Sequence, residues 1–196
     1  MEAWCERSTF QAMDTIRASV VTVSDKGYAG QREDVSGPLL VRLLQDVGAE
    51  VLHQAIVPDE RAEIARLLAA LADEASEEGS EEGSEEGSKE RGLDLVVTTG
   101  GTGVTPRDVT PEATKSVIEL EMPGISEALR FTGYSKTPLA AISRGVAGIR
   151  GRTLIINLPG SPNAVRDGME TLAPILPHVI RMIRGQDTEH DHEKEP

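Results

Sequence analysis

Cysteine is almost absent from this chain, since Cys5 is the only one among 196 residues. A lone cysteine excludes a disulfide framework and a zinc site built from cysteines. Aromatic residues make up only 3% of the chain, and no stripe of lysine and arginine is interleaved with them, which argues against a nucleic-acid partner. No apolar run has the length of a membrane span, and residues 1–17 contain no apolar segment of signal-peptide length. We therefore expect a soluble, cytoplasmic protein that binds neither membranes nor nucleic acid.

Acidic residues are in excess, and the formal net charge is −13. Two segments account for most of it: residues 73–92 carry nine carboxylates against Lys89 and Arg91, and residues 186–196 carry five against Lys194. The rest of the chain is therefore close to neutral. The net charge does not exclude a substrate that carries phosphate.

Three copies of Ser-Glu-Glu-Gly occupy residues 76–87. The repeat has no apolar side chain to bury, and its glycines and crowded like charges disfavour a helix. We expect an acidic low-complexity loop over residues 76–91, inserted into a single domain of residues 17–185. Residues 1–16 and 186–196 are expected to be a flexible N-terminus and a flexible acidic tail. The acidic block is either a tolerated insertion between a helix and a strand or a functional acidic arm.

Short apolar runs alternate with segments of helical periodicity along the rest of the chain. Strands are expected at residues 18–23, 51–57, 93–97 and 153–156, with a further strand and a hairpin turn between 139 and 157. Helices are expected at residues 39–47, 64–71, 111–120, 124–132 and from 162 to near 185, interrupted at Pro174. A chain of this length fits one domain of the α/β class. The pattern predicts three layers, a mainly parallel sheet with helices on both faces.

The most informative segment is LDLVVTTGGTGVTPRDVTPE at residues 93–112. Three glycines within residues 100–103 allow a tight turn and let backbone N–H groups approach a ligand closely. Such N–H groups, together with threonine hydroxyls, suit a phosphate or another anion. The sequence is neither a Walker-type loop nor a dinucleotide fingerprint, because the lysine and the third glycine that these need are missing.

The residues after this loop favour a binding site over a plain glycine-rich turn. Arg107 and Asp108 offer a cation that pairs with phosphate beside a hard oxygen ligand for a divalent metal. Thr110 and Pro111 fit the N-cap and the first position of a helix, whose positive end would face the same place.

Three other expected strands also end in chemically distinctive sequence. Ser24 and Asp25 follow the first strand, Pro58 and Asp59 follow the second, and residues 157–162 (NLPGSP) follow a late one. Each of these sequences has a structural alternative as a turn or a helix cap. Ligands of open α/β sheets bind beyond the carboxyl ends of the strands. Convergence of all four strand ends on one edge would therefore indicate a binding site.

Taken together, these segments resemble the molybdopterin adenylyltransferases, which include the bacterial Mog proteins and domains of gephyrin and its plant counterpart. The segments are VVTVSDKG at 20–27, IVPDE at 56–60, LDLVVTTGGTGVTPRDVTPEAT at 93–114, EMPGI at 121–125 and SRGVAGIRGRTLIINLPGSP at 143–162. The resemblance extends over residues 17–184, with the Ser-Glu-Glu-Gly block as an extra.

The resemblance implies a fold, a reaction and an assembly. The fold is the molybdopterin-binding fold of the Mog proteins. The reaction joins the terminal phosphate of molybdopterin to the AMP of ATP and releases pyrophosphate, with a requirement for Mg²⁺. The resemblance also implies a homotrimer and transfer of the product to a molybdenum-inserting enzyme.

The resemblance further implies roles for individual residues. Asp59 and Asp108 match the family's two acidic active-site positions, and both would act in catalysis by positioning Mg²⁺ and phosphate. The residues that would bind the nucleotide and its phosphates are Thr99, Gly100, Gly101, Thr102, Gly103 and Arg107. The residues that would bind molybdopterin are Ser24, Asp25, Asn157, Pro159, Gly160 and Ser161.

Three alternatives remain open from the sequence. A paralogous molybdopterin-binding bacterial protein shares the Gly-Gly-Thr-Gly loop but departs from Arg-Asp-Val-Thr-Pro-Glu, which is intact at residues 107–112. The metal-inserting enzyme of the same pathway has a different glycine loop and needs additional domains. A trimeric carrier would bind molybdopterin without turnover. Retention of Asp59 and Asp108 favours the enzyme over the carrier.

Deletion of residues 76–88 should leave folding and turnover nearly unchanged, because no side chain of this block can enter an apolar core. The deletion variant and the wild type are compared by the rate of adenylylation and by oligomeric mass. A large fall in turnover, or loss of the trimer, would show that the block is a functional arm.

Overall fold

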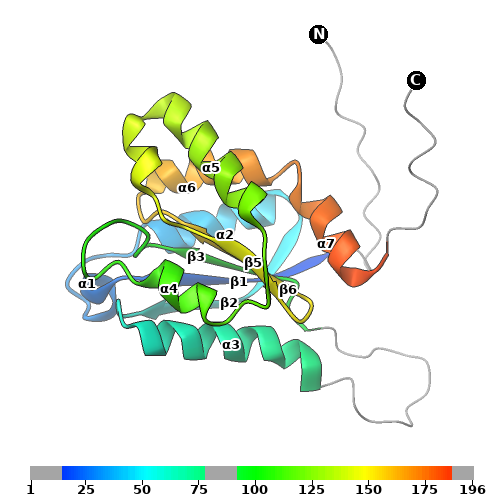
Figure 1. Cartoon of the computed structure of the whole chain (residues 1–196). Helices are drawn as coiled ribbons and strands as arrows, with labels where there is room; N and C mark the ends of the chain where they lie inside the picture. Colours follow the sequence, from blue (N-terminus) through cyan, green and yellow to red (C-terminus); the bar gives the residue numbers. More distant parts are fainter. Residues whose placement is uncertain (1–14, 78–91, 187–196) are drawn as a thin grey trace.

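The computed structural model describes residues 15–77 and 92–186 (Figure 1). Its elements in chain order are β1 (Ile16–Val23), α1 (Asp25–Tyr28), α2 (Ser36–Asp46), β2 (Ala49–Val57), α3 (Arg61–Glu77), β3 (Leu95–Thr99), α4 (Thr110–Lys115), β4 (Leu120–Glu121), α5 (Pro123–Lys136), η1 (Pro138–Ile142), β5 (Ala147–Arg150), β6 (Thr153–Leu158), α6 (Pro162–Leu172) and α7 (Leu176–Arg184). None of the helices in the described ranges is long and apolar enough to cross a membrane.

One six-stranded sheet has the order β2-β1-β3-β6-β5-β4. The strands β2, β1, β3 and β6 pair in parallel, whereas β5 pairs antiparallel with β6, and β4 pairs antiparallel with β5. The prediction of a mainly parallel sheet is therefore confirmed. Parallel pairing places the carboxyl ends of four strands at the same edge.

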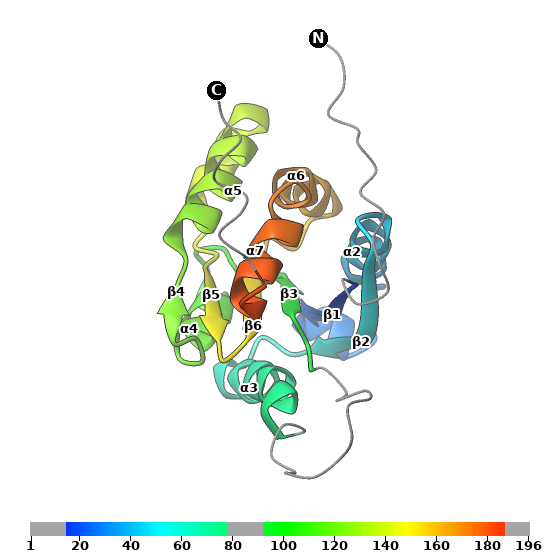
Figure 2. The same cartoon turned by 90° about the vertical axis from the view of Figure 1, so that its right-hand side faces the viewer.

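The central strands are buried on both faces of the sheet. In β3, Val97 packs into the core under α2 and α6, and its neighbour Val96 packs into the core against α3 and α4. Ile156 and Ile155 in β6 divide in the same way, because successive side chains of a strand point to opposite faces. Figure 2 shows α2, α5 and α6 on one side of the sheet and α3 and α4 on the other. This arrangement confirms the predicted three layers.

Most of the expected elements have somewhat different bounds in the structure, and for two of them the hydrogen bonds give the reason. The helix expected at 111–120 ends at Lys115, because the N–H groups of Glu119 and Met122 donate to Ile149 and Ala147 in β5 instead of continuing the helix. The strand expected at 93–97 is Leu95–Thr99, since Thr98 and Thr99 pair with both β1 and β6.

The acidic block overlaps the end of a helix. Because α3 continues to Glu77, the first two residues of the block are helical and do not belong to a loop. The rest of the expected loop, together with residues 1–14 and 187–196 of the expected flexible termini, lies outside the described residues.

A buried ion pair joins the last helix to the start of the sheet. Arg184 in α7 donates to both carboxylate oxygens of Asp94, at 2.8 and 2.6 Å, and the two side chains are only 2% and 5% exposed. Asp94 also accepts from the N–H of Arg17 in β1, and Arg184 also donates to the carbonyl of Thr15. These bonds connect the start of β1, the residue before β3 and the end of α7.

Arg184→Met should lower the free energy of unfolding by about 3–5 kcal/mol, because it removes the buried guanidinium that pairs with both oxygens of the Asp94 carboxylate. The control is Lys136→Met, which removes the partner of Asp167 and Glu170 at a lysine that is 39% exposed, and which should cost no more than about 1 kcal/mol. Urea unfolding measures both variants. Equal losses in the two would contradict the structural role given to the buried pair.

Candidate active site

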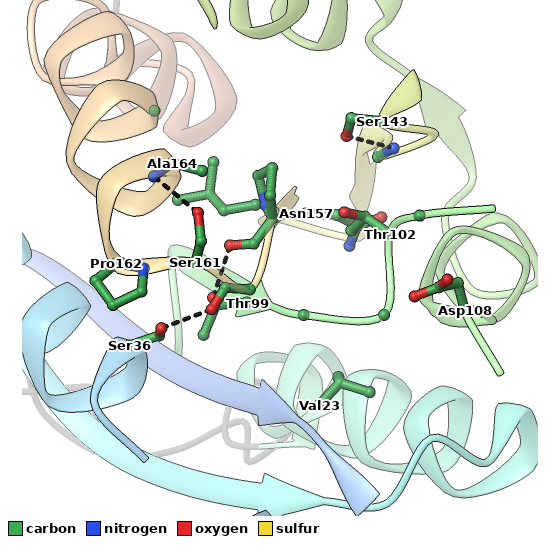
Figure 3. A pocket seen from close by; sticks show the side chains of 18 of the residues that line it. Val23, Ser36, Thr99, Thr102, Asp108, Ser143, Asn157, Ser161, Pro162 and Ala164 are labelled. Carbon is green, nitrogen blue, oxygen red and sulfur yellow. Dashed lines mark hydrogen bonds between the residues drawn. The ribbon is translucent and has the colours of Figure 1, made fainter. Parts of the chain in front are cut away.

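A pocket of about 890 Å³ lies where β1, β2, β3 and β6 end (Figure 3). The expected convergence of four strand ends on one edge is therefore present. The sequence-predicted residues that line the pocket are Ser24, Asp59, Thr99, Gly100, Gly101, Thr102, Gly103, Asp108, Asn157, Pro159, Gly160 and Ser161. Asp25 and Arg107 are not among the lining residues.

The floor of the pocket is formed by two glycine turns in contact with each other. Gly100 has φ +106°, and a Cβ there would collide with the carbonyl oxygen of Val23. A Cβ on Gly160 would lie 3.1 Å from the Cα of Gly100, so neither turn has room for a side chain at this point. The N–H of Gly100 donates to the carbonyl of Leu158 at 3.1 Å and ties the turns together. Glycine is required here by backbone conformation and by close approach.

Hydroxyl groups brace these turns from several elements. Thr99 donates to the carbonyl of Pro159 at 2.9 Å, and Ser36 donates to the carbonyl of Gly160 at 2.7 Å. Thr110 donates to the carbonyl of Gly100 at 3.0 Å. The prediction that Thr110 is an N-cap was wrong, because α4 begins at Thr110 itself and its hydroxyl is used on the glycine turn.

Two serines of the pocket act as helix caps. Ser161 accepts from the N–H of Ala164 at 3.2 Å and begins α6. Ser24 accepts from the N–H of Gly27 at 3.1 Å and from Arg32 Nη2 at 3.0 Å. Each serine oxygen accepts within the protein, and a hydroxyl also carries one proton that it can donate to a ligand.

The side-chain amide of Asn157 makes its hydrogen bonds within the protein, through both its nitrogen and its oxygen. It is 2% exposed, and its Nδ2 donates to the hydroxyls of Thr98 and Thr114 at 3.0 and 2.9 Å. Its Oδ1 accepts from the N–H of Val146 at 3.2 Å. Both N–H donors of Asn157 are therefore used inside the protein, and the side chain joins β6 to β3 and α4.

Asp59 is held by a reciprocal pair of hydrogen bonds with Asp25. The N–H of Asp25 donates to Asp59 Oδ2 at 2.8 Å, and the N–H of Asp59 donates to Asp25 Oδ1 at 3.0 Å. Asp59 does not cap α3, which was its structural alternative, but instead binds the first N–H of α1. The carboxylate of Asp59 lines the pocket from this position.

Arg107 lies outside the pocket lining, and its guanidinium pairs with two carboxylates. Its Nε and Nη2 donate to the carboxylate of Asp25 at 3.0 and 2.9 Å, and its Nη1 donates to Glu60 at 2.9 Å. The side chains of Arg107 and Asp25 are 55% and 44% exposed. In this structure Arg107 is a brace for Asp25, and the phosphate-pairing position expected from the sequence is not the one observed.

The surroundings of Asp25, Asp59 and Asp108 shift the pKa values of these side chains in different directions. Burial raises the pKa of Asp59, and the nearby charges of Asp25 and Asp108 also raise it, against the hydrogen bond from Asp25. The hydrogen bonds from Arg107 lower the pKa of Asp25. Burial acts to raise the pKa of Asp108, but hydrogen bonds from Thr105 and from the N–H of Gly103 hold it below its ordinary value. Of these three aspartates, Asp59 is the one whose pKa lies above its ordinary value.

The lining of the pocket includes charged residues that the sequence did not single out. These residues are Arg32, Glu33, Asp34, Arg130 and Asp167, which line the pocket together with the predicted Asp59 and Asp108. Arg32 and Asp34 could have been inferred, because they follow β1 at the same edge of the sheet. Arg130 lies in α5, and no motif marks it. The lining therefore contains five carboxylates and two arginines, and one of the carboxylates, Asp167, is paired with Lys136.

The donor set fits Mg²⁺ bound together with a substrate. No group of three or more His, Cys, Asp or Glu side chains that could hold a metal occurs in the part of the chain that the structure describes. Asp59 and Asp108 are nevertheless close enough that the charge of Asp108 raises the pKa of Asp59. Two carboxylates without a complete protein cage are typical of Mg²⁺, which keeps waters and takes its other ligands from substrate phosphates.

Comparison with known proteins agrees with this geometry. Residues 19–178 match a family described as a probable molybdopterin binding domain. The molybdopterin adenylyltransferase of Helicobacter pylori strain J99 is 39% identical, over 88% of this chain and 90% of that protein. The molybdenum cofactor synthesis protein cinnamon of Drosophila melanogaster is also 39% identical, over 87% of this chain, which spans only 26% of that longer protein.

The fold is shared with solved structures. The molybdopterin biosynthesis enzyme MoaB from Thermus thermophilus has 43% sequence identity and a TM-score of 0.75, over 87% of this chain and 98% of that one. The family match spans both glycine turns, Asp59 and Asp108. The chain therefore belongs to the family of the molybdopterin adenylyltransferases.

Proposed function

We propose that this protein transfers AMP from ATP to the terminal phosphate of molybdopterin and releases pyrophosphate, as a step of molybdenum cofactor biosynthesis. The observation that carries the proposal is the placement of two carboxylates, Asp59 and Asp108, beside a turn of glycine N–H groups in one pocket. The reaction brings several phosphates together, so it needs donors and a cation aimed at the reacting oxygens.

The chemistry assigned to the pocket is a displacement at phosphorus. An oxygen of the molybdopterin phosphate attacks the α-phosphorus of ATP, the bond from that phosphorus to the bridging oxygen breaks, and pyrophosphate leaves. Within residues 99–103, the backbone N–H groups of Gly101 and Thr102 and the Thr102 hydroxyl would hold the nucleotide phosphates, because the N–H groups of Gly100 and Gly103 and the Thr99 hydroxyl donate within the protein. When bound by Asp59 and Asp108, Mg²⁺ would neutralise charge on the phosphates.

Molybdopterin would lie against the turn that follows β6. Ser24, Pro159, Gly160 and Ser161 line this side of the pocket, and we assign them to molybdopterin binding. Asn157 would support the turn from within the fold, since its amide donors are used there. Asp25 and Arg107 would act without touching the substrate. Asp25 would hold Asp59 through its N–H, and Arg107 would hold the carboxylate of Asp25.

A carrier that binds molybdopterin without turnover would need the pocket but not its paired carboxylates. Burial, together with the nearby charges of Asp25 and Asp108, raises the pKa of Asp59. A carboxylate held in such surroundings beside Asp108 suits a reaction that uses a cation. We therefore favour the enzyme.

We also propose that the protein is a homotrimer and that its product passes to a molybdenum-inserting enzyme. The relative cinnamon supports the second point, because there a unit like this chain is part of a longer cofactor-synthesis protein.

Converting Asp59 or Asp108 to Asn should lower the rate of adenylylation by roughly two orders of magnitude or more, the scale seen when a preorganised electrostatic group is lost. Asn keeps the size and one acceptor oxygen, so Asp59→Asn can still accept the N–H of Asp25. The melting temperature and the affinity for molybdopterin should therefore change little. Product formation, molybdopterin binding and thermal unfolding are measured on both variants.

The control is Asp73→Asn, which alters an aspartate paired with Arg150 outside the pocket and should turn over like the wild type. Near-normal turnover in both Asp59→Asn and Asp108→Asn would remove the catalytic assignment and leave only structural roles for these residues.

Light scattering at micromolar concentration should give three times the 21.0 kDa mass of one chain. A mass of a single chain under these conditions would contradict the homotrimer.

A further inference from the structure

The loop between the glycine turn and α4 has little packing of its own. Residues 104–107 are exposed, and the side chain of Val104, the only large apolar one among them, is 65% exposed. Within the loop, the N–H of Asp108 donates to the carbonyl of Thr105 at 3.0 Å, and the N–H of Thr105 donates to Asp108 Oδ2 at 2.7 Å. Polar bonds therefore decide where this loop lies.

One side chain from a distant part of the sequence joins the two ends of the loop. Arg144 lies between η1 and β5, and its Nε donates to the carbonyl of Gly103 at 2.6 Å. Its Nη2 donates to the carbonyl of Asp108 at 2.5 Å. Its backbone N–H donates to the carbonyl of Thr102 at 2.9 Å. The residue contacts both the glycine turn and the residue that carries the pocket carboxylate.

An ion pair sets the direction of this guanidinium group. Nη1 of Arg144 pairs with Glu112 in α4, which leaves Nε and Nη2 directed at the loop carbonyls. The three nitrogens of the planar guanidinium thus bind three different acceptors, which are two backbone carbonyls and one carboxylate. The single ammonium of lysine cannot reproduce this arrangement. Arg144 is absent from the lining of the pocket, whereas Gly103 and Asp108 belong to it.

We propose that Arg144 is a positioning residue for adenylyl transfer, which holds the carbonyls of Gly103 and Asp108 and so fixes the phosphate-facing turn relative to the Asp108 carboxylate. This inference rests on the function proposed above. Loss of the fork would let the loop sample positions in which the Asp108 carboxylate and the N–H groups of the turn no longer face the reacting phosphate together.

The test compares Arg144→Gln with Arg144→Lys and with a matched arginine elsewhere. Arg150 also makes three guanidinium bonds, two to Asp73 and one to the carbonyl of Val117, but it lies outside the pocket. Arg144→Gln should lower kcat by about 10- to 100-fold, since a small misplacement of a catalytic group has effects of this size. Arg144→Lys should be intermediate, and Arg150→Gln should keep the wild-type kcat. The KM for molybdopterin should change little in all three.

Amide hydrogen exchange provides a readout that does not depend on activity. Residues 103–108 should exchange faster in Arg144→Gln than in the wild type, and should be unchanged in Arg150→Gln. A kcat of Arg144→Gln equal to that of Arg150→Gln would overturn the proposal, as would unchanged exchange in the loop. If Arg144→Gln does not fold, Arg144→Lys is used for the same comparison.

Failure of the proposed function is separable from failure of this inference. If the wild type does not adenylylate molybdopterin, the proposed function is wrong, and exchange in the loop then decides the role of Arg144. Faster exchange in the variant keeps its role in ordering the loop, and unchanged exchange overturns it.

Discussion

Parallel pairing of β2, β1, β3 and β6 is the constraint on which the site depends. It brings four carboxyl ends to one edge, and the pocket lies there. The same pairing requires strands that are buried on both faces, which Val96 with Val97 and Ile155 with Ile156 satisfy by packing into opposite cores. At each of these four strand ends, the buried residues of the strand are therefore followed directly in the sequence by residues of the pocket edge.

Hydrogen bonds and close backbone contacts fix the two glycine turns of the pocket. The turns at Gly100 and Gly160 touch, and hydroxyls from Thr99, Ser36 and Thr110 tie them in place. Around this rigid floor, carboxylates outnumber arginines. Mg²⁺ held by Asp59 and Asp108, as proposed above, would offset this excess of negative charge beside a bound polyphosphate.

Much of this architecture could be predicted from the sequence because it depends on local signals. Apolar runs marked the strands, and polar or glycine-rich sequence marked the edge where they end. What could not be predicted depends on tertiary contacts. Arg107 follows the glycine loop closely, yet its guanidinium pairs with Asp25 and Glu60, which only the tertiary fold brings within its reach. Thr110 braces Gly100 instead of capping a helix, and the chain after Lys115 joins the edge of the sheet because β5 offers it hydrogen-bond partners. Arg130 reaches the pocket only because α5 packs beside it.

We propose that this pocket transfers AMP and does not merely bind molybdopterin. Release of pyrophosphate from ATP by the purified protein, followed with and without added molybdopterin and in the presence of Mg²⁺, tests this. We expect pyrophosphate release that depends on molybdopterin, is matched by formation of adenylylated molybdopterin, and stops when the metal is chelated. Tight binding of molybdopterin without release of pyrophosphate would contradict it and identify the protein as a carrier.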